Sequence, residues 1–200
     1  ETGQIKTEIP VSLLVDTSRR AALCANHSAT HLLHEALRIV LGEHVAQKGS
    51  LVSPRRLRFD FSHSTAMKAE EIIAVEDIVN TRIRMNSAVS TRLMTPDEAV
   101  KEGAVALFGE KYGDEVRVVS MGGVADNAKK SAWSLELCGG THVSQTGDIA
   151  LFKVVGEAAV AGGIRRIEAV SHEHGLSYLS GRDATLLRAA HVLKATPDQL

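Results

Sequence analysis

The residues of this sequence best suited to chemistry are two pairs of metal-capable side chains, with the members of each pair four positions apart. His27 and His31 form an H-x-x-x-H pair, and Cys138 and His142 form a C-x-x-x-H pair. On an α-helix this spacing puts both side chains of a pair on one face, one turn apart. Imidazole and thiolate groups suit Zn²⁺, which takes four such ligands in a tetrahedron. The sequence therefore predicts one zinc ion per chain, held by all four residues.

The residues around these pairs exclude two familiar classes of zinc enzyme. A zinc peptidase of the H-E-x-x-H type needs a glutamate directly after the first histidine, and this chain has Ser28 there. A zinc nucleobase deaminase needs an H-x-E motif together with P-C-x-x-C, and the sequence has neither. Hydrolysis of an activated ester stays open, because it needs only a positioned water, a polarised carbonyl and a pocket.

The number of ligands leaves two roles for the metal open. Four protein ligands close the coordination sphere, as in structural zinc sites, whereas catalytic zinc usually keeps three ligands and a water. Zinc would then either shape the pocket and orient the ester or, with one ligand loose, bind a water whose pKa falls toward ~7. The half of the site from Cys138 to His142 contains Gly139 and Gly140, so we expect it to be the more mobile half. Cys24 is an alternative ligand.

A long helix must carry the first pair, and a strand must lead into the second. Asn26 is the expected N-cap of the helix, and Gly42 its C-terminal stop. The apolar residues of this helix repeat at helical spacing on the side opposite its histidines: Leu32, Leu33, Ala36, Leu37, Val40 and Leu41. We therefore expect His27, His31 and His34 to face away from the core.

The pattern along the whole chain predicts an α+β fold, an antiparallel sheet with helices packed on one face. Strands and helices do not alternate strictly, as they would in a parallel doubly wound sheet. Strands are expected at residues 45–52, 57–61, 88–94, 115–121, 133–138, 149–157 and 164–170, and further helices at 68–85, 96–102 and 176–194. Residues 1–20 are interpreted as a strand and lead-in from an upstream β subdomain, residues 21–175 as the zinc-containing domain, and residues 176–200 as a helix leading toward a further C-terminal domain.

Composition limits how the chain can bind nucleic acid and where it works. The formal net charge is −1 and aromatic residues make up 4% of the chain, so neither bulk phosphate attraction nor base stacking is the expected main binding device. Two cysteines form no disulfide framework and fit a reducing compartment, the cytoplasm. No apolar run approaches the ~18 residues of a membrane span, so no membrane partner is expected. The chain begins with Glu1, which suggests a piece of a longer protein.

Four motifs resemble the editing domain of alanyl-tRNA synthetase: H-S-A-T-H-L-L-H, G-S-L-V-S-P-R-R-L-R-F-D-F-S-H, L-C-G-G-T-H and G-I-R-R-I-E-A-V. The likeness runs from about Arg19 to His172 and implies the fold of the threonyl/alanyl-tRNA synthetase additional domain. It also implies zinc-dependent hydrolysis of serine or glycine from mischarged tRNA(Ala). The implied partners are the acceptor end of tRNA(Ala) and the remaining domains of a parent synthetase. ATP would bind only in an aminoacylation domain outside this chain.

The resemblance also adds residues to the site. Thr30 precedes His31, and the matching threonine of the family lines the amino-acid pocket, where a hydroxyl can recognise a substrate hydroxyl. The alternative for Thr30 is a hydrogen bond back to its own helix. Gln47 matches a pocket glutamine of the family. The alternative interpretation of Gln47 is a polar strand residue that faces solvent. Thr30, Gln47 and Cys138 are therefore the candidate catalytic residues.

Binding of tRNA is expected to rest on a few basic residues. Those on loops and strand ends suit phosphate contacts: Lys48, Arg55, Arg56, Arg58, Lys129, Lys130, Arg165 and Arg166. Arg58, Arg165 and Arg166 lie in motifs of the family, as does Asp148, and these four join Thr30 and Gln47 as candidate tRNA and substrate contacts. Two other functions stay open: a non-catalytic zinc-stabilised tRNA-binding module and a free-standing trans-editing deacylase.

Overall fold

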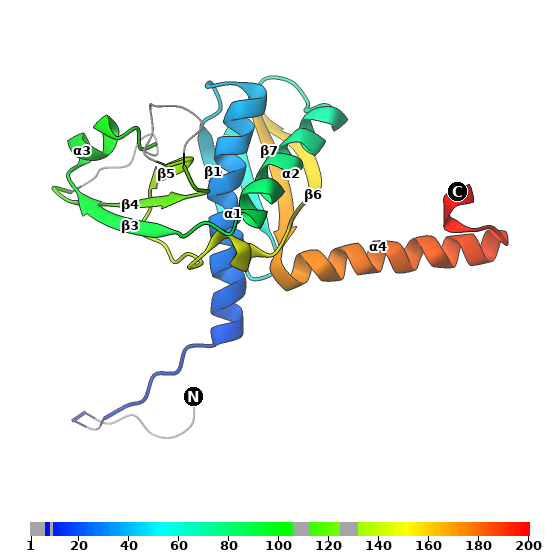
Figure 1. Ribbon diagram of the computed structural model, residues 1–200, viewed down its shortest axis with the longest axis horizontal. Coiled ribbons are helices and arrows are strands. Elements are labelled where there is room, and N and C mark those ends of the chain that lie inside the picture. Colours follow the sequence, from blue (N-terminus) through cyan, green and yellow to red (C-terminus); the bar gives the residue numbers. More distant parts are fainter. Residues whose placement is uncertain (1–6, 9, 106–112, 125–131) are drawn as a thin grey trace.

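The described strands form two antiparallel sheets, which confirms the α+β class (Figure 1). The structure is a computed structural model that describes residues 7–8, 10–105, 113–124 and 132–200. The four-stranded sheet has the order β1 (Gln47–Val52), β2 (Leu57–Ser62), β7 (Ile164–Ser171) and β6 (Phe152–Ala161). The three-stranded sheet has the order β3 (Ser90–Met94), β4 (Val116–Met121) and β5 (Ser134–Leu137). The expected strands are thus divided between two sheets.

The helices differ in how they are placed on these sheets. Their bounds are α1 (Thr17–Leu41), α2 (Ala69–Arg84), α3 (Pro96–Lys101) and α4 (His172–Leu193), with short 3₁₀ turns η1 (Thr146–Ile149) and η2 (Pro197–Gln199). The helices α1 and α2 contact each other and the four-stranded sheet, and α1 also contacts β5 of the other sheet. Figure 1 shows α1 running through the body between the two sheets, while α4 extends away from it. The helix that carries the histidine pair is therefore covered on two sides.

The main hydrophobic core lies between α1, α2 and the four-stranded sheet. It contains Leu33 and Leu37 of α1 together with buried side chains of the other elements: Phe59 of β2, Ile167 of β7 and Val79 of α2. Full burial of one such side chain stabilises the fold by roughly 1.5–3 kcal/mol. A second, smaller core under the three-stranded sheet holds α3 against β4 and β5. The main core holds α1 in place, and the three-stranded sheet places β5 against α1.

The helix α1 begins earlier than expected, so the assignment of Asn26 as its N-cap is wrong. The cap is Asp16, whose side-chain oxygen accepts a hydrogen bond from the backbone N–H of Arg19 at 2.9 Å. Asn26 lies inside the helix with none of its surface exposed. Its side chain donates to the carbonyl oxygen of Ser53 at 2.9 Å and accepts from the hydroxyl of Ser171 at 2.9 Å. Asn26 thus ties α1 to the β1–β2 turn and to the end of β7.

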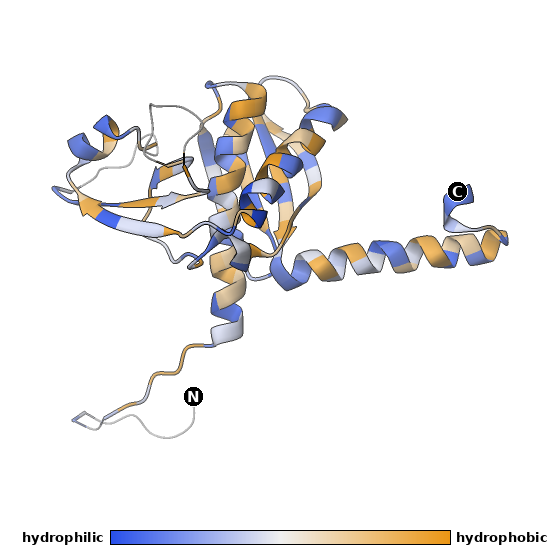
Figure 2. Ribbon diagram, in the orientation of Figure 1, coloured by the Kyte–Doolittle hydropathy of each residue, from blue (hydrophilic) through white to orange (hydrophobic). Residues whose placement is uncertain are grey.

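The N-terminal segment forms no strand within described residues 7–8 and 10–16. Its apolar side chains are exposed, and Leu14 keeps 94% of its surface. A lone strand without a partner cannot bury its own face. Figure 2 shows apolar residues both on this arm and along α4. Among the helices of the described residues, none combines the length and apolar character of a membrane span.

Most other element boundaries fall within a few residues of the prediction. Thr95 and Glu98 form the expected capping box of α3, in which Glu98 N–H donates to Thr95 Oγ1 at 3.3 Å. The expected strand from residue 149 begins only at Phe152, because η1 occupies residues 146–149. The C-terminal helix begins at His172, four residues before the predicted start. Residues 125–130 of the expected loop lie outside the described residues.

Candidate metal centre

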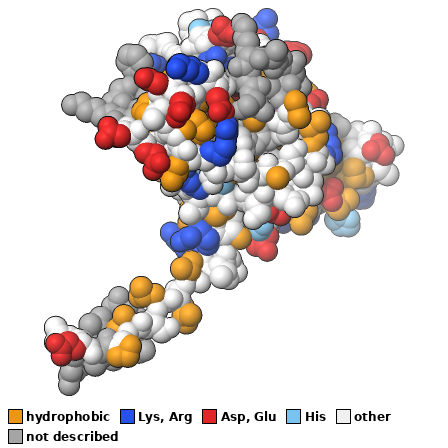
Figure 3. All heavy atoms as spheres, turned by 60° about the vertical axis from the view of Figure 1, so that its left-hand side comes forward, with side chains coloured by type: hydrophobic (Ala, Val, Ile, Leu, Met, Phe, Trp, Pro, Cys, Tyr) orange, Lys and Arg blue, Asp and Glu red, His pale blue; other side chains and the backbone are white. Residues whose placement is uncertain are grey.

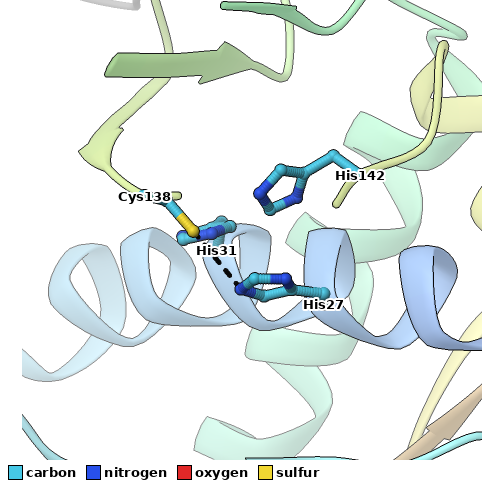
Figure 4. A group of neighbouring side chains, drawn as sticks. All are labelled: His27, His31, Cys138 and His142. Atoms are coloured by element: carbon cyan, nitrogen blue, oxygen red, sulfur yellow. Dashed lines mark hydrogen bonds between the residues drawn. The ribbon is translucent and has the colours of Figure 1, made fainter. Parts of the chain in front are cut away.

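The two pairs of metal-binding residues come together at the surface of α1 that faces the three-stranded sheet. His27 and His31 lie on α1, and Cys138 and His142 lie on the loop that follows β5. One ligand atom from each lies within 4.8 Å of all the others, and Cys138 Sγ is 3.4 Å from His27 Nε2. Figure 4 shows the four side chains pointing toward one another from helix and loop. The predicted grouping is therefore present, with its second pair on a loop.

A glycine lets the loop approach the helix. A Cβ atom added at Gly140 would overlap the ring of His27, whereas one added at Gly139 would meet no atom within 4 Å. The loop is also anchored at its start, because Cys138 N–H donates to the Arg117 carbonyl at 3.0 Å. The Arg117 guanidinium donates to the carbonyl oxygens of Cys138 and Gly140. This half of the site was predicted to be mobile, yet its described contacts hold it in place.

Glu136 of β5 orients one histidine of the cluster. Its carboxylate oxygens lie 2.7 Å from His31 Nδ1 and 3.1 Å from His34 Nδ1. A carboxylate only accepts hydrogen bonds, so both Nδ1 atoms must carry the proton. The lone pair of a neutral His31 is then on Nε2, a buried atom without a hydrogen-bond partner among the described residues. A carboxylate behind a metal-binding histidine commonly fixes its ring and tautomer in this way.

Ser28 orients the loop histidine in a similar way. Its hydroxyl oxygen accepts a hydrogen bond from the Val143 N–H at 3.2 Å and lies 3.2 Å from His142 Nδ1. When Nδ1 donates to Ser28, the lone pair of His142 is on Nε2, which is also buried without a partner. The donor set of this cluster fits zinc. Within 4.8 Å it offers two imidazole nitrogens without partners, a third imidazole and a thiol. In contrast, Cys24 does not belong to this group among the described residues.

The electrostatics of the cluster favour a cation. Burial raises the pKa of the Cys138 thiol, but the close imidazoles of His142, His27 and His31 outweigh it and lower the pKa to about 3. Burial also lowers the pKa of His31, yet the charge of Glu136 and the contact with Cys138 raise it to about 10. The positive histidines hold the pKa of Glu136 well below its usual range against the opposing effect of burial. A thiolate and a carboxylate thus attract positive charge to the place where a metal ion would bind.

The expectation that the histidines of α1 face away from the core is wrong for two of them. His31 is buried, and His34 is only 2% exposed and packs against Phe59 at 5.3 Å between ring centroids. The reason is that β5 covers this side of α1 and places Glu136 against both rings. The apolar pattern of a helix marks the face on its main core and does not indicate a second sheet.

Thr30 and Gln47, predicted for the substrate pocket, lie on different elements. Thr30 is 4% exposed, and its hydroxyl donates to the Asn26 carbonyl at 2.8 Å, so the bond back to its own helix is present. The oxygen of that hydroxyl keeps its capacity to accept. Gln47 is half-buried on β1, directly opposite Phe61 of β2. Opposite residues of an antiparallel pair share a face, so Gln47 points to the side of the sheet that α1 covers.

Asp148 lies beside the cluster. It is exposed in η1, where its carboxylate accepts from the Gln145 N–H at 3.0 Å, as a turn residue does. It also lines a hollow of about 450 Å³ together with His142, Cys24 and His172. The hollow gives the side chain of His142 an open space on one side.

The arginines predicted to contact tRNA are held by carboxylates in the four-stranded sheet. Arg165 donates twice to Glu157, at 2.5 and 2.6 Å, and Arg166 donates twice to Asp60, at 2.7 and 2.8 Å. Consecutive residues of a strand point to opposite faces, so these two arginines do not form one patch. Arg58 Nε lies 3.7 Å from the Asp60 carboxylate. The charge of each guanidinium is therefore partly neutralised. Lys129 and Lys130 lie outside the described residues.

Sequence reasoning did not find three residues that organise the centre: Ser28, Arg117 and Glu136. Glu136 had the clearest signal, as a carboxylate between Leu135 and Leu137 in the strand that leads to Cys138. From its position in the sequence, Ser28 indicates only that the chain is not an H-E-x-x-H peptidase. Nothing local distinguishes Arg117 from other strand arginines.

Comparison with known proteins agrees with this arrangement. Residues 116–168 match the family described as the threonyl and alanyl tRNA synthetase second additional domain. The whole chain is 56% identical over 199 residues to the alanine–tRNA ligase of Rhizorhabdus wittichii. It is 58% identical over 198 residues, 98% of its length, to that of Rhizobium meliloti. In both cases it spans 22% of the relative.

The chain thus contains the second additional domain shared by threonyl- and alanyl-tRNA synthetases, a class with an α+β fold. More specifically, it belongs to the alanyl-tRNA synthetase family and corresponds to the editing-domain segment of that enzyme.

Proposed function

We propose that this chain is a zinc-dependent deacylase that hydrolyses the aminoacyl ester of Ser-tRNA(Ala) or Gly-tRNA(Ala). The observation that carries the proposal is the cluster of His27, His31, Cys138 and His142, in which two imidazole nitrogens are buried without partners. The cluster borders a hollow of about 450 Å³, which gives an ester room beside His142. The similarity to alanine–tRNA ligases supports an ester of tRNA as the substrate.

The residues at the proposed centre would have separate roles: some would hold the metal ion, and others would keep the loop in place. His27, His31, Cys138 and His142 would hold zinc, which supplies positive charge to polarise or orient an ester carbonyl. Because Arg117 and Ser28 anchor the loop, the contacts favour four retained ligands and an orienting role. In this role the chain positions the ester and its attacking water.

Selection of serine over alanine is proposed to rest on the hydroxyl of Thr30. Its proton is committed to the Asn26 carbonyl, so the oxygen can accept a hydrogen bond from the hydroxyl of a seryl ester. An alanyl ester lacks that hydroxyl and would leave the buried oxygen unpaired. Sites that bind a substrate hydroxyl in this way reject the analogue without it strongly. Gln47 is proposed to line the same pocket, and Asp148 to line the hollow at His142.

The wider setting is proposed from the relatives. Because the chain spans 22% of each relative, we take it as one part of a cytoplasmic synthetase that ligates alanine to tRNA(Ala) with ATP bound in another domain. Residues 21–175 would form the editing domain, and α4 would lead toward a further domain. Arg58, Arg165 and Arg166 stay candidates for phosphate contacts, each weakened by its carboxylate partner.

Two readings compete with this proposal. A closed set of four ligands is also what a non-catalytic zinc-stabilised tRNA-binding module would have. A free-standing trans-editing deacylase would also match only a small share of a synthetase, so it stays the second alternative.

One experiment separates an enzyme from a binding module. The zinc-loaded chain is incubated with Ser-tRNA(Ala) and, separately, with Ala-tRNA(Ala), and ester loss is followed over time. The proposal predicts rapid loss of serine and slow loss of alanine with the unaltered chain. With the His31→Ala variant, neither ester should be lost faster than in buffer. A binding module would leave both esters as stable as they are in buffer.

A further inference from the structure

A second hollow, of about 690 Å³, lies where the starts of α1 and α4 meet the β1–β2 turn. Arg19 of α1, Arg55 and Arg56 of the turn, and His174 of α4 line it, together with Asp16. Figure 3 shows Lys and Arg side chains gathered where the N-terminal arm joins the body, at the level where α1 begins. Three separate segments thus bring basic side chains to one cavity.

The positive charge of this hollow is only partly neutralised. Arg56 pairs with Glu168 at 3.2 Å, but the guanidinium groups of Arg19 and Arg55 have no ionic or hydrogen-bond partner among the residues that the structure describes. The carboxylate of Asp16 already accepts from a backbone N–H as the cap of α1. The first turn of α1 contains no further acidic side chain, so Asp16 is the one carboxylate of the described lining that offsets the arginines and the positive end of the helix dipole.

We propose that this hollow binds the phosphate backbone of the RNA acceptor strand. Planar guanidinium groups recognise phosphate oxygens through paired hydrogen bonds, and helix N-termini favour anions. The remaining lining, Ser53 and Pro54, offers no large apolar anchor of the kind that a protein partner would use. This inference rests on the proposed function for the identity of the ligand, since it is the substrate that brings the phosphates.

The hollow is close enough to the metal centre to serve the same substrate. Arg19 and His27 are eight residues apart on α1, which is about 12 Å along the helix axis at 1.5 Å per residue. Arg19 and Ala21 point to opposite sides of α1, and Ala21 lines the hollow beside His142. A strand held at Arg19 and Arg55 therefore needs only a few nucleotides to pass around α1 and present its terminal ester at the metal centre.

The test uses a double variant and a control with the same charge change. Arg19→Ala with Arg55→Ala removes the two unpaired guanidinium groups of the hollow. Arg20→Ala with Arg182→Ala removes two exposed arginines that do not line it. Binding of uncharged tRNA(Ala) to the zinc-loaded 200-residue chain is titrated at several salt concentrations. Zinc content, melting temperature and hydrolysis of Ser-tRNA(Ala) at saturating concentration are measured for each protein.

The first double variant should bind tRNA more weakly and with a flatter salt dependence. Two lost phosphate contacts make the slope of log affinity against log salt shallower by roughly 1.4–1.8. When the salt concentration rises fourfold, the unaltered chain should therefore lose about 7- to 12-fold more affinity than the double variant. Zinc content, melting temperature and hydrolysis at saturation should stay unchanged, and the control pair should keep the original slope.

Three results would overturn the inference: an unchanged slope in Arg19→Ala/Arg55→Ala, an equal change in the control pair, or no tRNA binding by the unaltered chain. Binding of polyglutamate as tight as that of tRNA, and lost in the same variant, would assign the hollow to an acidic protein segment instead. Failure of the proposed function looks different. In that case Ser-tRNA(Ala) would stay intact while the salt slope still depended on Arg19 and Arg55.

Discussion

Glu136 gives the sharpest test of how the proposed metal centre is built. Its carboxylate contacts the ring of the proposed ligand His31 and the ring of His34, and it is not itself a proposed ligand. The substitution Glu136→Gln keeps the shape of the side chain and removes its charge. Glutamine offers one acceptor oxygen, so its NH₂ group would face the Nδ1 proton of His31 or His34. One ring must then turn or change tautomer, and the centre loses a negative charge.

The expected loss is 10- to 100-fold in zinc affinity, the usual effect of removing the partner behind a metal-binding histidine, or roughly 1.4–2.7 kcal/mol. Affinity is measured by competition with a chromophoric chelator at neutral pH. Glu76→Gln is the matched control, since Glu76 is equally buried and accepts from Val154 N–H and Lys153 Nζ, each at 2.7 Å. The control should lower the melting temperature and leave zinc affinity alone. If Glu136→Gln gave only that same pattern, the carboxylate would stabilise the fold without serving the metal.

Three further predictions concern the loop, the pocket and the sheet. Gly140→Ala should displace the His27 ring and lower zinc content measured by atomic emission, whereas Gly139→Ala should not; equal zinc in both would contradict the close approach. Thr30→Val should bring the hydrolysis rates of seryl and alanyl esters closer together, and an unchanged ratio would refute hydroxyl recognition. The hydrogen bond and charge of Arg166 lower the pKa of Asp60 against the effect of burial, so this pair stabilises the fold at neutral pH. That stability is lost as pH falls below about 3.8, so Arg166→Ala should destabilise the chain more at pH 7 than under acid; an equal loss at both would contradict the pairing.

The grouping of four metal-capable side chains could be predicted from sequence, because residue type and spacing indicate it. His27 and His31 need only a helix to lie together, and Cys138 is one of two cysteines in the chain. The α+β class followed similarly from local periodicity. The partner of each ligand could not be predicted, because Glu136 and Ser28 acquire their roles only when β5 and the following loop pack against α1.

The errors have the same physical origin. Asn26 has the residue type of a helix cap, but its amide satisfies the Ser53 carbonyl and the Ser171 hydroxyl inside the fold. A local rule therefore placed the start of α1 ten residues too late, next to Asn26 instead of Asp16. His34 was expected to face away from the core because a helical pattern reveals the face on the main core and cannot reveal a second sheet.

The most direct test of the whole account is a zinc titration read out by hydrolysis. The metal is removed with a chelator, zinc is returned in measured steps, and the rate of serine release from Ser-tRNA(Ala) is followed together with the amount of bound zinc. We predict that the rate rises in proportion to bound zinc and stops rising at one zinc per chain. Full activity in the metal-free chain, or no activity at one bound zinc per chain, would contradict the assignment of His27, His31, Cys138 and His142 as the centre of a zinc-dependent deacylase.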